Sequence, residues 1–61
     1  MQDADEVIFE FHQQGNFMKI TAVDVSTGLE VVSIAPASLS RHQQMLLAKR
    51  KLKYVMEKSD R

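Results

Sequence analysis

The chain has 61 residues, a formal net charge of zero and no cysteine. A chain of this length forms one domain, here residues 1–61 with an ordered core expected at about 6–58, and it buries only about 60% of its unfolded surface. Without cysteine, no disulfide or thiolate–metal cluster can add stability. Association with a second copy is then an expected way to gain it.

No apolar run approaches the 18 or so residues that cross a bilayer. The first six residues are acidic in character, which is unlike the basic start of a signal peptide. We therefore expect a cytoplasmic protein with no membrane contact.

The two halves of the chain carry opposite charge. Residues 1–30 contain six acidic residues and one basic residue, a net charge of −5, whereas residues 31–61 contain seven basic and two acidic residues, a net charge of +5. Such a division is typical of some nucleic-acid-binding proteins. It also favours attraction between two halves of one fold, or between two copies of it.

Two strands are predicted first, near 7–13 and 17–24, from alternating apolar and polar residues rich in β-forming types. Gly15 and the asparagine after it fit a two-residue type II′ turn, because glycine accepts a positive φ at the first position. This turn pairs residues whose numbers sum to 31. Phe11 then faces Ile20, and the apolar residues of both strands share one face.

A third strand is predicted near 29–35, and it must end there because Pro36 cannot donate to a strand ladder. The segment 26–28 before it fits a three-residue loop closed by Gly28 as a G1 bulge. That loop pairs residues whose numbers sum to 54. The third strand would then add Val32 and Ile34 to the apolar face of the first two strands.

A helix is predicted near 39–58, with Ser38 or Ser40 as N-cap and strong helix formers throughout. Its apolar stripe consists of Met45, Ala48, Leu52, Val55 and Met56. The stripe should cover the sheet face formed by Val7, Phe9, Phe11, Met18, Ile20, Ala22, Val32 and Ile34. The predicted fold class is therefore α+β: a three-stranded antiparallel β-meander followed by one amphipathic C-terminal helix packed on one sheet face (βββα).

Apolar residues remain outside this core. Leu47 and Tyr54 lie on the side of the helix away from the stripe, and Ile8, Val23 and Val31 form a cross-strand row on the second sheet face. Single exposed apolar residues are normal, but a cluster indicates a contact surface. The leading prediction is a small protein-interaction module that forms a homodimer. Open edges of the outer strands offer another route to pairing.

Basic residues of the helix support an alternative, a nucleic-acid-binding protein that uses Lys49, Arg50, Lys53 and Lys58. Such a helix side could meet phosphates. The same residues also suit a solvated helix face, where cations near the C-terminus complement the helix dipole. No nucleic-acid-binding motif and no exposed aromatic pair accompany them.

The sequence offers no pattern typical of catalysis. His12 and His42 lie far apart and lack a second ligand at metal-binding spacing. Both glycines are used in turns, so no phosphate-binding loop remains. We predict no enzyme activity and no catalytic, metal or cofactor-binding residue, and we infer no small-molecule substrate.

Several short motifs follow one another along the chain: Glu10-Phe11-His12, Gly15, Lys19 to Asp24, Thr27-Gly28, Glu30-Val31, Pro36-Ala37 and Lys51 to Val55. In this order they resemble a group of short uncharacterised alphaproteobacterial proteins of unknown function, over roughly residues 8–56. The resemblance implies a bacterial cytoplasmic setting. It implies no activity and assigns no functional residue.

Overall fold

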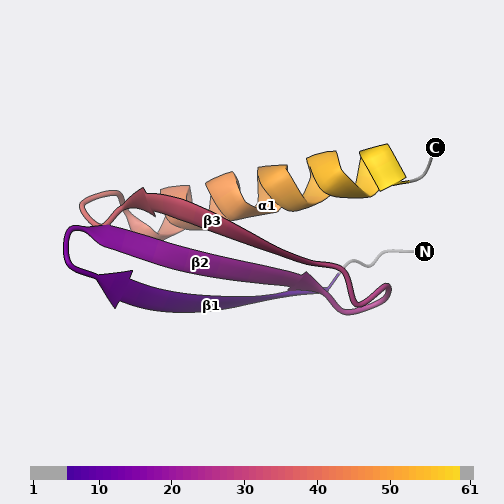
Figure 1. The fold of residues 1–61 in the computed structure, drawn as a ribbon, viewed down its shortest axis with the longest axis horizontal. Coiled ribbons are helices and arrows are strands. Elements are labelled where there is room, and N and C mark those ends of the chain that lie inside the picture. The colour runs from indigo at the N-terminus through magenta and orange to yellow at the C-terminus, as the bar shows by residue number, and fades with distance from the viewer. Residues whose placement is uncertain (1–5, 60–61) are drawn as a thin grey trace.

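The computed structural model describes residues 6–59 and contains three strands and one helix. The strands β1 (Val7–Gln14), β2 (Phe17–Asp24) and β3 (Glu30–Pro36) form an antiparallel sheet in the order β1-β2-β3. The helix α1 (Arg41–Ser59) lies along one face of this sheet (Figure 1). The predicted βββα fold class is confirmed.

The hairpin of β1 and β2 has the predicted register. Phe11 pairs with Ile20 and Phe9 with Ala22, so the paired residue numbers sum to 31. Gly15 has φ +61°, and no described non-glycine residue has a positive φ. This combination is that of a type II′ turn, in which only the first loop residue needs a positive φ.

The hairpin of β2 and β3 differs from the prediction by one residue. The N–H of Asp24 donates to the carbonyl of Leu29 at 2.8 Å, and the N–H of Gly28 donates to the carbonyl of Asp24 at 2.7 Å. The loop therefore has four residues, Val25 to Gly28, and paired residue numbers sum to 53, as in Ala22 with Val31. The predicted three-residue loop and its register are wrong, although Gly28 does have the expected positive φ of 77°.

The longer loop has a local cause in the side chain of Asp24. Its Oδ2 atom accepts hydrogen bonds from the Thr27 hydroxyl at 2.6 Å, the Ser26 hydroxyl at 3.0 Å and the Thr27 N–H at 3.1 Å. Asp side chains commonly close turns by accepting from donors two or three residues ahead. These bonds favour a loop that begins directly after Asp24, one residue earlier than predicted.

A shift of one residue exchanges the two faces of a strand. On β3, Val31, Ser33 and Ala35 are buried, whereas Val32 is 38% exposed and Ile34 is 59% exposed. The placement of Val32 and Ile34 in the core was therefore wrong. The remaining predicted core residues of β1 and β2 do lie on the face toward α1.

The start and the buried stripe of α1 follow the prediction closely. Ser40 is the N-cap, because its hydroxyl accepts the N–H of Gln43 at 3.1 Å. Ala48 and Leu52 are buried against the sheet, with Val55 and Met56 packed beside them. Gln44 was not anticipated: it is 2% exposed, and its amide donates to the Leu39 carbonyl at 3.1 Å.

Candidate interaction surface

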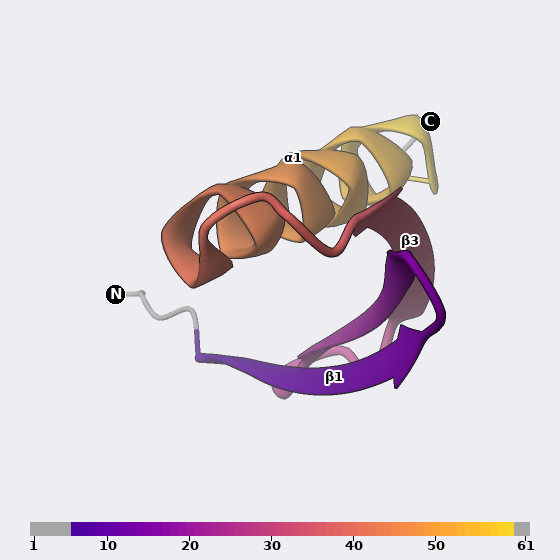
Figure 2. The same cartoon turned by 90° about the vertical axis from the view of Figure 1, so that its left-hand side faces the viewer.

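The helix covers only part of the sheet. Its main contacts are with β3 and β2, and the sheet curves away from it toward β1 (Figure 2). Small residues explain the close approach on one side, since Ala48 of α1 and both Ser33 and Ala35 of β3 are buried. One helix is about 10 Å wide, the width of about two strands at 4.8 Å each, whereas three strands occupy roughly 14 Å.

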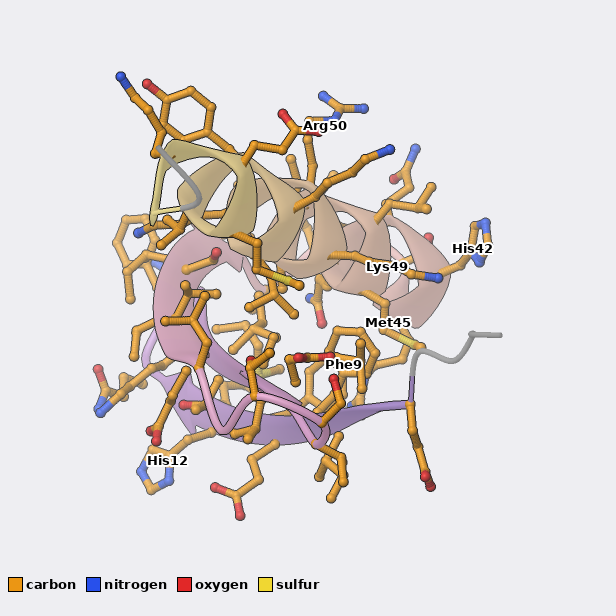
Figure 3. The ribbon with its side chains drawn as sticks, turned by 90° about the vertical axis from the view of Figure 1, so that its right-hand side faces the viewer. Phe9, His12, His42, Met45, Lys49 and Arg50 are labelled. Atoms are coloured by element: carbon orange, nitrogen blue, oxygen red, sulfur yellow. The ribbon has the colours of Figure 1, made fainter. Side chains whose placement is uncertain are left out.

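The inner face of β1 is consequently half open. Val7, Phe9 and Phe11 are only partly buried against the core. The rings of Phe9 and Phe11 are stacked at 6.4 Å between centroids, and the guanidinium of Arg41 lies 4.0 Å from the centre of the Phe11 ring. Phe9 points toward α1 on the side where Met45 and Lys49 project (Figure 3). An aromatic pair thus lies at the rim of the core.

The edge of β1 is also open. The carbonyl of Glu6 accepts the N–H of Val25 at 3.1 Å, so the even-numbered residues of β1 direct their backbone groups to β2. Those of the alternate residues, Val7, Phe9, Phe11 and Gln13, point outward. Within residues 6–59 these outward groups have no hydrogen-bond partner. Four residues of exposed N–H and C=O groups form a surface on which another strand can pair.

The edge of β3 is partly protected: the outward carbonyls of Val32 and Pro36 accept hydrogen bonds, whereas the outward groups of Ile34 have no partner among residues 6–59. The Lys51 ammonium of α1 donates to the outward carbonyl of Val32 at 2.6 Å. Pro36 has no N–H to offer, and its carbonyl accepts the Leu39 N–H at 3.2 Å. Lysine, proline and a covering helix are the devices by which edge strands avoid pairing.

The predicted apolar row on the outer sheet face is only partly present. Ile8 pairs with Val23 as expected, with Ile8 52% exposed and Val23 partly buried. Val31 is wrong as a member, because the shifted register puts it in the core at 7% exposure. Its place opposite Val23 is taken by Glu30. The same shift adds large exposed apolar side chains that the sequence analysis assigned to the core, those of Val32 and Ile34.

On α1, Leu47 and Tyr54 are exposed by 38% and 59%. At 100° per residue they lie within about 60° of Lys51, so they occupy the flank of the helix toward the β3 edge. They form no single patch with Ile8 and Val23, which lie on the far side of the sheet. Beside Leu47, a hollow of about 260 Å³ is lined by Leu39, Gln43, Leu46, Leu47 and Arg50.

The four basic residues of the alternative prediction do not share one side of α1. Lys49 and Lys53 lie on the flank toward β1, where they line a hollow with Val7, and Arg50 points away from the sheet (Figure 3). Lys58 lies on the other flank, with its ammonium 5.5 Å from the centre of the Tyr54 ring. None of the four forms an ion pair with a carboxylate of the described residues.

Histidines and carboxylates are dispersed. His12 lies on the outer sheet face opposite Lys19, and His42 lies in the first turn of α1. Residues 6–59 contain no group of three or more His, Cys, Asp or Glu side chains that could hold a metal ion. Of the carboxylates, Asp24 has a pKa below its ordinary value. The Thr27 hydroxyl is the main cause, opposed by burial and assisted by Ser26 and the Thr27 N–H.

These features define a small α+β domain with one helix, one protected sheet edge and one open sheet edge. The chain belongs to a family described as a domain of unknown function (DUF6898), whose model matches residues 4–59. No curated protein and no solved structure matches the chain. Within residues 6–59, no helix is long and apolar enough to cross a membrane.

Proposed function

We propose that the chain is a small non-catalytic interaction module that acts as a homodimer, in a bacterial cytoplasm. The observation that carries the proposal is the half-open β1, where Val7, Phe9 and Phe11 line the rim of the core beside an unpaired strand edge. A second copy would cover both the apolar side chains and the backbone groups. No other feature of the described residues calls for a partner on so many counts.

The thin core supports the same proposal. Seven apolar residues of the described chain are buried, and eight large apolar residues are exposed: Ile8, Phe17, Val25, Val32, Ile34, Leu46, Leu47 and Tyr54. A domain near 60 residues gains only a few kcal/mol from its core, and oligomerisation is a common supplement. Further burial of the partly buried Val7, Phe9 and Phe11 in a dimer would add stability at about 25 cal/mol per Å².

The test is the mass of the full chain by light scattering coupled to size-exclusion chromatography, from low to high micromolar concentration. We expect a mass twice that of the 7.0 kDa chain. A 7.0 kDa species at every concentration would contradict the homodimer.

A second candidate function is binding of nucleic acid, favoured by the unpaired Lys49, Arg50 and Lys53 on neighbouring parts of α1. Cations that neutralise phosphates release counterions, so binding must weaken steeply with salt. Titration of duplex and single-stranded probes near 50 mM and 200 mM salt tests it. Absence of binding at the lower salt concentration would end this candidate. Lys58 makes no contribution in this version, because it lies on the other flank of α1.

A further inference from the structure

We infer that the two copies pair through the open edge of β1, antiparallel about a two-fold axis at Phe11, to form one continuous six-stranded sheet. This inference rests on the proposed homodimer and adds the surface, the strand direction and the register. The partner is a second copy of this chain. A two-fold pair of identical open edges leaves neither edge unpaired, since each supplies what the other lacks.

The direction of the backbone groups limits the possible registers. Only Val7, Phe9, Phe11 and Gln13 present outward N–H and C=O groups, so every hydrogen-bonded pair across the axis must be drawn from these residues. Five or more residues of each strand pair when the axis lies at Phe9, Glu10, Phe11 or His12. Within the bounds of β1, Val7–Gln14, an axis at Phe9 or His12 pairs five residues of each strand, whereas an axis at Glu10 or Phe11 pairs seven. The Glu10 axis brings all four outward residues into hydrogen-bonded pairs, and the Phe11 axis brings in all of them except Val7.

Charge separates the two longer registers. An axis at Glu10 would put this carboxylate directly opposite Glu10 of the second copy, and like charges at that position are destabilising. An axis at Phe11 puts Glu10 opposite His12 of the second copy, twice over. This register keeps the seven-residue pairing, avoids the repulsion between the two carboxylates and puts an imidazole opposite each carboxylate, at the cost of the pair that includes Val7, and we adopt it.

The apolar side chains fit the same register. Phe11 would lie opposite Phe11 of the second copy, with each Phe9 ring already stacked on its own Phe11 at 6.4 Å. Four rings would then form one cluster on the sheet face that α1 leaves open. Because strands are about 4.8 Å apart, the two helices would lie roughly 19 Å apart on that face. The four rings would cover the part of the sheet that lies between the two helices. The six-stranded sheet would then have an apolar core at its centre.

Arg41 is the main cost of this arrangement. Each guanidinium lies 4.0 Å from the centre of its own Phe11 ring, so two like charges would approach the axis. Both remain at the surface, where their repulsion is screened at physiological ionic strength. The exposure of both guanidinium groups keeps this cost below the gain from the paired strands.

The first experiment removes one outward N–H and leaves the backbone hydrogen bonds between β1 and β2 in place, although the bond from the Gln13 side chain to the Gly15 carbonyl at 3.1 Å is also lost. Gln13→Pro deletes the donor to the carbonyl of Phe9 in the second copy, and it does so twice across the axis. We expect the dimer dissociation constant to rise roughly 100-fold, since a net hydrogen bond is worth up to about tenfold. Ile34→Pro is the matched control, because the N–H of Ile34 points outward from the other edge. It should leave the dissociation constant within about threefold of the original.

The second experiment locates the axis without relying on a proline variant. A residue on a two-fold axis meets its own copy, and the chain has no cysteine of its own. Single substitutions Phe9→Cys, Glu10→Cys, Phe11→Cys and His12→Cys therefore mark the four axes that pair five or more residues. We expect a disulfide-linked dimer to form fastest with Phe11→Cys under mild oxidation, because paired residues across strands lie within disulfide range.

The outcomes separate this inference from the homodimer itself. A monomeric original chain would contradict both. A dimeric original chain that stays dimeric with Gln13→Pro, or that dissociates with Ile34→Pro, would overturn the β1 edge alone. Fastest cross-linking at residue 9, 10 or 12 would overturn the register, and a dimer that cross-links at none of the four would overturn the edge.

Discussion

The two edges of this sheet are treated differently by the same chain. At β3, Lys51 of the helix donates to the carbonyl of Val32, and Pro36 has no N–H. At β1, the outward N–H and C=O groups of four residues have no hydrogen-bond partner among residues 6–59. The helix accentuates the contrast, since it covers β2 and β3 and leaves the aromatic residues of β1 at the rim.

The contrast shows where the stability of a single copy resides. One helix can bury about two strands, so the third strand depends on the hairpin alone or on something outside the chain. A protein with no use for the β1 edge would be expected to block it as it blocks the β3 edge. The selective protection of the β3 edge therefore supports the proposal that the β1 edge pairs with another strand.

The largest effect should come from the covered half of the sheet. Leu52 is 2% exposed beneath α1, and Leu52→Ala should lower the free energy of unfolding by about 2–5 kcal/mol through lost burial and a cavity. Urea unfolding followed by circular dichroism measures it. Leu46→Ala is the matched control: this side chain is 45% exposed, and its loss should cost about 0.5 kcal/mol or less.

Comparing Leu52→Ala with Phe11→Ala would sharpen the difference between the halves. The loss from Leu52→Ala should include a large part that is the same at every protein concentration. The loss from Phe11→Ala should shrink as the protein is diluted, because dilution removes the dimer contacts that involve Phe11. A concentration-independent loss for Phe11→Ala would indicate that β1 is stabilised within one copy.

A smaller effect is expected from Asp24, which sets the register of β3 and so decides which residues reach the protected edge. Its hydrogen bonds lower its pKa below the ordinary value near 3.9. The carboxylate therefore stabilises the fold fully above that value, and the contribution is lost as the pH falls through the lower pKa of the folded state.

Asp24→Asn should reduce stability at neutral pH and flatten the acid part of the stability profile, measured by urea unfolding between pH 2 and 7. Glu30→Gln is the control, because this substitution removes the same charge from the neighbouring strand. The Glu30 carboxylate is exposed and accepts no side-chain hydrogen bond in residues 6–59. An unchanged acid profile in Asp24→Asn would show that the apolar pattern, rather than the turn, holds the register.

The sequence predicts elements better than it predicts the second register. Strict alternation, a glycine-led turn and Ser40 are local signals, and each predicted its element to within a residue or two. The β2–β3 loop was mispredicted because two loops fit the same six residues, and the three-residue loop closed by Gly28 was chosen; the apolar pattern then agreed with it, since it buries Val32 and Ile34. The choice depended on three hydrogen bonds to Asp24, which no apolar pattern encodes.

The interaction surface was predictable only in part for the same reason. Ile8, Leu47 and Tyr54 are exposed as expected, but Val31 moved to the core with the register. The open inner face of β1 was missed, although a signal was present: one helix cannot cover three strands. The role of Lys51 required knowing which carbonyl of β3 points outward, and that again follows from the register.

The smallest effect on stability, and the most direct test of the two edges, should come from Lys51→Ala. An exposed ammonium bonded to a carbonyl contributes about 1 kcal/mol or less, so unfolding should change little. The oligomeric state should change more, because the Val32 carbonyl loses its only donor among residues 6–59. A dimer paired at β1 would then have two unprotected β3 edges, one from each copy, at which further copies can pair. Light scattering should therefore show species larger than the dimer, and their share should grow with concentration.

Lys53→Ala removes the same charge and side-chain length from the opposite flank of α1, so it is the control for Lys51→Ala and should remain a dimer. If both variants keep the original mass, Lys51 does not protect the edge and Pro36 with the neighbouring helix suffices. If both form larger species, the loss of positive charge is responsible, because Lys53 donates no hydrogen bond to β3 among residues 6–59. Only growth confined to Lys51→Ala would tie the asymmetry of the two edges to a single hydrogen bond.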